Sequence, residues 1–304
     1  MGTLLATEFG HEGVISTLRP TSAAVDAAFG PPPELRFRRR IRLLASLVEV
    51  WRRRELVRSL AERELRARYK QAILGFAWAV ITPLLLMLVF TLVFPRVAKV
   101  DTSGAPYPLF AYLGLLPWAF FSTSVSSGGQ SILTNMTLLN KVYCPREVFP
   151  IASVGVAGTD SAVAVVVMCL LFVVTGFIPH PDAIWIPALL AIQVGFTLGI
   201  TMVMSAVIVY LRDLRHALPI ILQLGLFATP VALSLDDLVP VRWQPLYVAI
   251  NPMAAVIDGY RSSILLGQPP QGNLTLIAAA STLVILVGGY ALFKRLETGF
   301  ADVA

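Results

Sequence analysis

The hydrophobic residues of this 304-residue chain fall into six long blocks separated by short polar stretches. The blocks lie at about residues 74–97, 108–127, 149–177, 184–210, 218–235 and 274–293. The first opens with 21 residues, 74–94, that carry no charge. A helix of about 20 residues, rising 1.5 Å per residue, crosses a hydrocarbon core about 30 Å thick. The pattern therefore predicts an all-α integral membrane protein with six transmembrane helices.

The segment before the first block shows a different, amphipathic pattern. Residues 41–72 contain no Gly or Pro, and Leu44, Leu47, Val48 and Trp51 recur at helical spacing opposite many arginines. This arrangement is typical of a helix lying in the membrane–water interface. Nucleic-acid binding is the alternative for such a basic cluster, but an arginine-rich segment beside a span is expected at the cytoplasmic leaflet. Residues 1–40 are predicted to form a disordered cytoplasmic tail.

Composition supports membrane insertion. Hydrophobic residues make up 56% of the chain and charged residues 14%, and the mean hydropathy is +0.74. Soluble domains are about 45–50% apolar and about 25% charged, which argues against a soluble enzyme. The two cysteines, Cys144 and Cys169, are too few for a disulfide framework or a four-cysteine zinc site.

The positive charges predict the orientation of the chain. Of the 24 Lys and Arg residues, 14 lie within residues 1–72. With both termini in the cytoplasm, 20 of the 24 fall inside and 4 fall outside. Cytoplasmic loops carry the excess of positive charge. We therefore expect a multi-pass membrane protein with both termini cytoplasmic.

Several kinds of chemistry have no sequence signature here. The chain has no G-x-x-x-x-G-K-[ST] motif, and His11, His180 and His216 match no metal-binding spacing. Asp160 is the acid placed clearly inside a predicted span. A proton-driven carrier would bury several ionisable groups, so one acid favours a buried structural role for Asp160. We expect no catalytic residue, no metal and no nucleotide site in this chain.

Five segments, in order, resemble one known family. They read ELRARYKQAILGFAWAVITPLLL (64–86), YLGLLPWAFFS (112–122), NKVYCPREVFP (140–150), YLRDLRHALPIILQLGLFATPV (210–231) and NPMAAVIDGYRSSIL (251–265). Together with six spans they resemble the type-2 ABC exporter permeases of the polysaccharide (O-antigen, teichoic acid, capsule and galactan) export family. The resemblance covers about residues 55–304, and the extension at residues 1–40 departs from it.

The resemblance implies a permease subunit without its own nucleotide-binding site. Two copies would form a homodimer and work with two copies of a separate cytoplasmic ABC ATPase, which binds ATP and Mg. The implied substrate is a lipid-linked polysaccharide moved from the cytoplasm to the outer face of the bacterial inner (plasma) membrane. Residues 236–270, between the fifth and sixth spans, are too polar and too interrupted by proline to span the bilayer, so they are predicted to form short re-entrant periplasmic helices.

Candidate substrate contacts are aromatic, because flat rings offer a surface on which sugar C–H faces can slide. These candidates are Phe76, Trp78, Phe90, Tyr112, Trp118, Phe120 and Phe121. The alternative for each is an interfacial belt or ordinary packing. Because the channel is expected along the dimer axis, side chains of the first, second and fifth spans should face it. Arg66, Arg68 and Lys70 are candidates for binding the lipid pyrophosphate, since guanidinium groups bind phosphates well.

The remaining candidates concern coupling and gating. The loop after the second span is predicted to contact the ATPase through Leu138, Leu139, Lys141, Arg146 and Glu147, with a membrane-surface helix as the alternative. Arg212, Asp213 and Arg215 are predicted either to cap a helix with an ion pair or to act as a cytoplasmic gate or coupling element. The resemblance implies a periplasmic gate around Trp243, Tyr247, Asn251, Pro252 and Arg261.

Two other functions remain open at this point. One is an ABC permease for a drug or small lipid, which would differ in the width of its cavity. The other is an integral membrane glycan-transfer enzyme, which needs a catalytic carboxylate or base near the membrane surface. Asp236 and Asp237 form the one close acidic pair outside the tail, and they fall on the outer face.

Overall fold

A computed structural model describes residues 54–69, 77–97, 104–139 and 144–300. The chain divides into two units, residues 1–40 and residues 41–304, and all the described residues belong to the second. The predicted tail at residues 1–40 lies outside the described residues, as do Phe76, Lys70 and Lys141 and the side chain of Arg68.

The described residues form helices and no strands, which confirms the predicted all-α class. The longer helices are α3 (Arg54–Tyr69), α4 (Trp78–Val97), α5 (Tyr107–Thr134), α7 (Val148–Thr175), α8 (Ile186–Tyr210), α9 (Leu214–Ala228) and α13 (Gly272–Leu296). The shorter ones are α6 (Met136–Leu139), α10 (Leu235–Leu238), α11 (Gln244–Ile250) and α12 (Pro252–Arg261). Helical turns of 3-10 type precede α8 and α11 and follow α13, and a π-helical turn follows α12.

Four helical segments in the described residues are long and apolar enough to cross a membrane. They are Tyr107–Thr134, Val148–Thr175, Pro181–Tyr210 and Gly272–Gly299. Two shorter apolar segments, Val80–Phe94 and Leu214–Ala228, fall in the first and fifth predicted blocks. The fifth block was predicted to run to residue 235, but α9 stops at Ala228 because Thr229 precedes Pro230 and takes an extended conformation.

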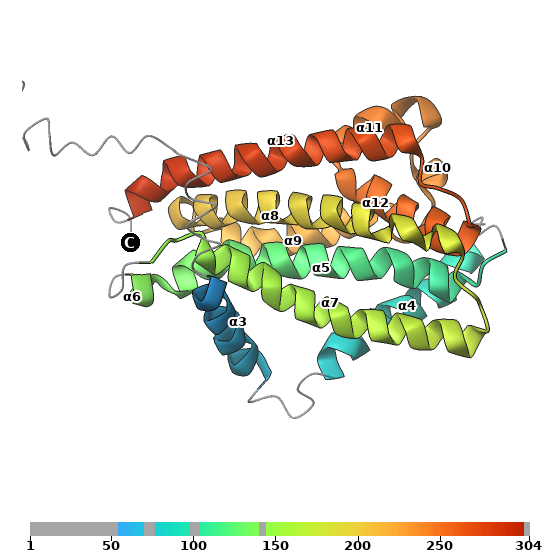
Figure 1. The fold of residues 1–304 in the computed structure, drawn as a ribbon, viewed down its shortest axis with the longest axis horizontal. Coiled ribbons are helices and arrows are strands. Elements are labelled where there is room, and N and C mark those ends of the chain that lie inside the picture. Colours follow the sequence, from blue (N-terminus) through green and yellow to red (C-terminus); the bar gives the residue numbers. More distant parts are fainter. Residues whose placement is uncertain (1–53, 70–76, 98–103, 140–143, 301–304) are drawn as a thin grey trace, which may run out of the picture. The chain divides into compact units, whose positions relative to one another are not determined.

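Helix α5 occupies the middle of the bundle. It packs against α4, α7, α8, α9 and α12, and most of its apolar side chains are buried. The hydroxyl of Tyr112 donates a hydrogen bond to the carbonyl of Ala164 on α7, at 3.0 Å. Helices α5, α7, α8 and α13 run alongside one another, while α10, α11 and α12 gather at the end of the bundle opposite α6 (Figure 1). We call the end with α10–α12 the outer end and the end with α6 the inner end.

Helices α8 and α13 touch backbone to backbone. A Cβ atom added to Gly199 would lie 2.9 Å from the carbonyl oxygen of Ile285, and one added to Gly289 would lie 2.6 Å from the carbonyl oxygen of Gly199. Such distances exclude any side chain at either position. Small residues permit this close approach, which dispersion forces stabilise where no water is present to drive association.

Gly289 and its neighbour Gly288 provide a matched test of this contact. Nothing lies within 4 Å of a Cβ added to Gly288. Gly289→Ala should lower the stability of the bundle by about 1–3 kcal/mol through overpacking. Gly288→Ala should be neutral or stabilising, because Ala favours helix by up to about 1 kcal/mol over Gly. Thermal unfolding of the detergent-purified protein, followed by size-exclusion chromatography, measures both, and equal midpoints would contradict the close contact.

Candidate functional site

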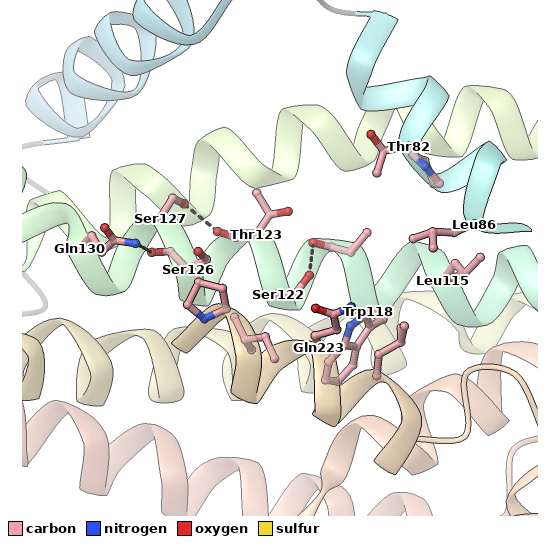
Figure 2. A pocket seen from close by; sticks show the side chains of 15 residues that line it. Thr82, Leu86, Leu115, Trp118, Ser122, Thr123, Ser126, Ser127, Gln130 and Gln223 are labelled. Atoms are coloured by element: carbon pink, nitrogen blue, oxygen red, sulfur yellow. Dashed lines mark hydrogen bonds between the residues drawn. The ribbon is translucent and has the colours of Figure 1, made fainter. Parts of the chain in front are cut away.

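A cleft of about 510 Å³ opens between α4, α5 and α9 (Figure 2). These helices fall in the first, second and fifth hydrophobic blocks, the three that were expected to face the channel. Its polar lining consists of Thr82, Ser122, Thr123, Ser126, Ser127, Gln130 and Gln223. Its apolar lining consists of Pro83, Leu86, Leu115, Trp118, Ala119, Pro219, Leu222 and Leu226. Among the described residues, the lining includes no Asp, Glu, Lys or Arg.

The polar side of the cleft is one face of α5. Ser122, Ser126 and Gln130 are four residues apart and so lie above one another on the helix, beside Thr123 and Ser127. The Ser127 hydroxyl donates to the carbonyl of Thr123 at 2.7 Å, and the Gln130 amide donates to the carbonyl of Ser126 at 3.3 Å. Because these donors are satisfied within the helix, a polar face is tolerated in an apolar bundle. The hydroxyl lone pairs stay available to a ligand in the cleft.

The predicted aromatic contacts lie in several places. Trp118 lines the cleft, held by Phe121 at a ring distance of 5.3 Å and by the close approach of Gly225. Phe121 stacks on Phe196 beneath it. Of the others that the structure describes, Trp78 is exposed at the start of α4, and Phe90, Tyr112 and Phe120 are buried in the core. The hydroxyl and amide face of α5 was not predicted, although the spacing of Ser122, Ser126 and Gln130 was its signal.

A second cavity of about 320 Å³ lies between α3, α5 and α7. It shares Ser127 and Gln130 with the cleft. Arg63 on α3 donates a hydrogen bond to Asn135, and Ser153 on α7 donates to a carboxylate oxygen of Glu64 at 3.0 Å. These bonds attach α3 to the bundle beside the inner part of the cleft.

The pyrophosphate and inner-end candidates are mostly exposed. Arg66 does not line either cavity; its guanidinium lies 3.4 Å from the carboxylate of Glu62. Arg212 and Asp213 lie in the exposed turn between α8 and α9, and Arg215 is exposed in the first turn of α9, where it donates to His216 at 3.0 Å. Asp160 is half-buried on α7.

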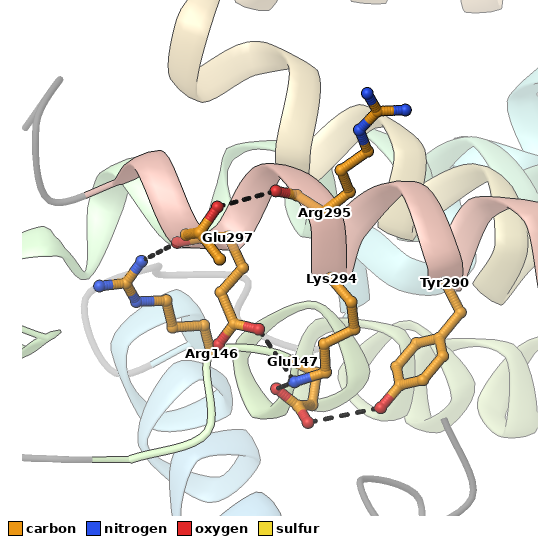
Figure 3. Close-up of polar contacts among 7 residues, drawn as sticks. Arg146, Glu147, Tyr290, Lys294, Arg295 and Glu297 are labelled. Carbon is orange, nitrogen blue, oxygen red and sulfur yellow. Dashed lines mark hydrogen bonds and ion pairs between the residues drawn. The ribbon is translucent and has the colours of Figure 1, made fainter. Parts of the chain in front are cut away.

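The predicted coupling residues divide into two groups. Leu138 and Leu139 are half-buried on α6. Arg146 and Glu147, just before α7, instead contact the inner end of α13 (Figure 3).

Arg261 joins three parts of the outer end. Its side chain is buried, with the residue 3% exposed. The guanidinium donates to the carbonyl oxygens of Phe110 (3.1 Å), Pro230 (2.7 Å) and Leu233 (2.9 Å). It also donates to the carbonyl oxygen of Val231. It also lies 3.6 Å from the centre of the Phe110 ring. Arg261 thus fixes α12 to α5 and to residues 229–234, the segment that leaves α9.

Two further predicted gate residues hold the same segment. The Tyr247 hydroxyl donates to the carbonyl of Ala228, and the Asn251 amide donates to the hydroxyl of Thr229 at 2.9 Å. Pro252 occupies the first position of α12, and Trp243 is exposed before α11. The outer helices therefore anchor the end of α9, one wall of the cleft.

Arg261→Lys tests whether the planar fork, rather than the charge, makes this anchor. A lysine keeps the charge but cannot reach four carbonyls in one plane, so buried acceptors lose their donors. We expect a loss of about 1–3 kcal/mol of stability for each carbonyl left without a donor. The control is Arg242→Lys, since Arg242 is an exposed outer-end arginine that lies over Trp243. Thermal unfolding in detergent measures both, and a similar small shift in the two variants would argue against the anchor.

Comparison with known proteins identifies one family. Residues 55–265 match the family described as ABC-2 type transporter. The chain is 33% identical over 254 residues to the O-antigen export system permease protein RfbA of Myxococcus xanthus, covering 84% of this chain and 97% of that protein. It is 27% identical over 250 residues to RfbA of Klebsiella pneumoniae, covering 82% and 95%. It is 25% identical over 244 residues to the polysialic acid transport protein KpsM of Escherichia coli, covering 79% and 93%.

Proposed function

The chain belongs to the ABC-2 type transporter family, and we propose that it is the permease subunit of an ATP-driven exporter of a lipid-linked polysaccharide. It would move this glycan from the cytoplasm to the outer face of the bacterial inner membrane. The similar proteins named O-antigen export permease and polysialic acid transport protein support a glycan substrate. The match covers nearly the whole length of each of these proteins.

The observation that carries this proposal is the cleft between α4, α5 and α9. A sugar chain needs partners for its hydroxyl groups, and Ser, Thr and Gln side chains provide both donors and acceptors. The lining lacks charged side chains among the described residues, so no ion pair would hold an anionic or cationic unit in place. Trp118, which is 8% exposed, adds a small aromatic surface for sugar C–H faces.

A second copy of the chain would complete the conduit. The cleft lies between three helices and is open on one side, so two copies facing one another would enclose a path. The helices that line the cleft also carry exposed apolar residues, among them Ile220, Leu224 and Phe227 on α9 and Leu85, Leu88 and Leu92 on α4. Such surfaces suit a partner helix or lipid. Two copies of a cytoplasmic ABC ATPase, holding ATP and Mg, would supply the energy.

The proposed topology has six spans. Helices α4 and α9 would complete the set begun by the four longer apolar segments. Helices α11 and α12 have 7 and 10 residues and extend about 10 Å and 15 Å, which is too short to cross the bilayer. They would enter the outer leaflet and return, buried against protein as irregular backbone must be. Both termini would be cytoplasmic, so α6 would face the ATPase and α3 would lie at the inner interface.

The pyrophosphate and coupling assignments belong to this proposal. Arg66, Arg68 and Lys70 would bind the diphosphate of the carrier lipid as it approaches along α3. Leu138, Leu139 and Lys141 would contact the ATPase. Arg212 and Asp213, in the turn before α9, and Arg215, in its first turn, would respond to ATPase closure and move the α9 wall.

Affinity purification from native membranes tests the assembly. The tagged chain should bring down an ABC ATPase at equal stoichiometry, and lipid-linked glycan extracted from the same cells should stimulate ATP hydrolysis. A chain that elutes alone from mild detergent and shows no ATP dependence would overturn the proposed function.

A variant that fills the cleft tests the transport path. Ser126→Trp places a large ring among the hydroxyl groups of α5, and we expect surface glycan to fall at least tenfold while the ATPase still copurifies. The control is Val166→Trp, since Val166 lies on α7 outside the cleft and is 67% exposed. Surface glycan per cell is measured for each variant, and an equal effect of the two would show that the cleft is not the path.

A further inference from the structure

A buried ion pair joins the start of α7 to the inner end of α13 (Figure 3). Glu147 is 1% exposed, and its carboxylate lies 2.7 Å from the ammonium nitrogen of Lys294. The same ammonium lies 2.9 Å from Glu297. The Tyr290 hydroxyl donates a longer bond, 3.5 Å, to the second oxygen of Glu147. The ion pair therefore joins residues 147 positions apart in the sequence.

Arg146 makes a second connection beside the first. It donates to the backbone carbonyl of Glu297, and its guanidinium lies 5.4 Å from the centre of the buried Phe300 ring. Phe300 packs against Tyr210 at the end of α8. The Tyr210 hydroxyl donates to the carbonyl of Leu296 at 2.7 Å. The inner end of α13 is thus bonded to the segment before α7 and to the end of α8.

The outer end of α13 contacts a different part of the protein. Leu274 and Ala278 are buried in one cluster with Val248 of α11 and Ala255 of α12. Between its two ends α13 has 25 residues and no proline, and it extends about 37 Å. Its backbone contact with α8 at Gly289 lies between the two ends. A displacement at one end of such a helix is carried to the other.

Burial gives the ion pair a positional role. Two charges removed from water are costly, and replacing such a pair with apolar residues is often neutral or stabilising. Stability alone therefore does not account for this pair. What an ion pair provides is one preferred placement of the two helix ends, because its bonds are directional and either charge alone is unfavourable.

We infer that α13 transmits movement of the segment before α7 to the outer helices α11 and α12, and that the Glu147–Lys294 pair is the linkage. This inference rests on the proposed function, because the movement would come from the partner ATPase. Lys294 is then a positioning residue: it touches neither the substrate path nor the nucleotide.

The test follows an outer-end position during the ATPase cycle. Val241, 72% exposed before α11, is changed to Cys, and Cys169 is changed to Ala. The reconstituted complex of full-length chain and ATPase is labelled with a membrane-impermeant maleimide added at the outer face, without nucleotide and after trapping with ATP and vanadate. Cys144 stays, because it lies near the opposite, inner end beside Arg146.

We expect trapping to change the labelling rate at least threefold in the parent complex and by less than 1.5-fold in Lys294→Gln. ATP hydrolysis and ATPase binding should persist in the variant, which a merely structural loss would not allow. Lys294→Arg should restore the change. The matched control is Arg295→Gln, which removes the same charge from the next residue, an exposed side chain that points away from the cluster (Figure 3). It should behave as the parent.

Other results would overturn the linkage. One is a Lys294→Gln complex whose labelling rate changes on trapping as much as that of the parent. Another is an Arg295→Gln complex that loses this change to the same extent as Lys294→Gln. The third is a parent complex that hydrolyses ATP but shows no change in the labelling rate of Val241→Cys. If Lys294→Gln does not fold, the double variant Glu147→Gln/Lys294→Gln replaces it, because it removes both charges of the pair. A double variant whose labelling rate still changes on trapping would overturn the linkage. A parent chain that binds no ATPase would instead overturn the proposed function, and the inference with it.

Discussion

The backbone between α9 and α10 is irregular, and its carbonyl groups must find donors inside the protein. Helix α9 ends early because Pro230 cannot continue it, and the carbonyl groups of Pro230, Val231 and Leu233 then need donors from outside the helix. The buried fork of Arg261 donates to these three carbonyls and to Phe110 of α5. Gly114 makes room for the guanidinium, since a Cβ there would lie 2.6 Å from it. One side chain thus sets where α9 ends and where α12 lies against α5.

The cleft depends on that arrangement. Its α9 wall carries Pro219, Leu222, Gln223 and Leu226, a few residues before the anchored segment. The opposite wall is the polar face of α5, where the hydroxyls of Ser122 and Ser127 and the amide of Gln130 donate to carbonyls of the same helix and are therefore tolerated in an apolar bundle. Hydrogen bonds join the outer helices to the end of the α9 wall. They are made by Tyr247 on α11, by Asn251 between α11 and α12, and by Arg261 on α12.

The hydropathy pattern predicted where the helices lie in the sequence, but not which residues of different helices contact one another. The third, fourth and sixth blocks match α7, α8 and α13 to within a few residues, because long apolar runs identify membrane helices directly. The second block was too short by seven residues, since the Ser- and Gly-rich continuation of α5 to Thr134 is polar in sequence yet partly buried. The contacts of Arg261 and the Glu147–Lys294 pair could not be predicted, because a one-dimensional pattern does not show which distant residues meet.

The candidate site was half predicted. The sequence identified the three helices that line the cleft and, among the aromatic candidates, Trp118. As substrate contacts, the sequence favoured aromatic rings over hydroxyl groups. However, Phe90, Tyr112 and Phe120 are buried in the core, because large apolar side chains gain most from burial. Ser122, Ser126 and Gln130 are spaced four residues apart, so they share one face of a helix. The same helical spacing that was applied to apolar residues would have identified this polar face.

The central claim is that the glycan passes along the polar face of α5, and photo-crosslinking tests it most directly. A photoreactive amino acid is placed at Ser122, Ser126 or Gln130, and at Val166 on α7 as the control, in cells that make the glycan. The account predicts glycan crosslinked to the chain at the three α5 positions and none at Val166. Crosslinking at Val166 but not on α5 would contradict it.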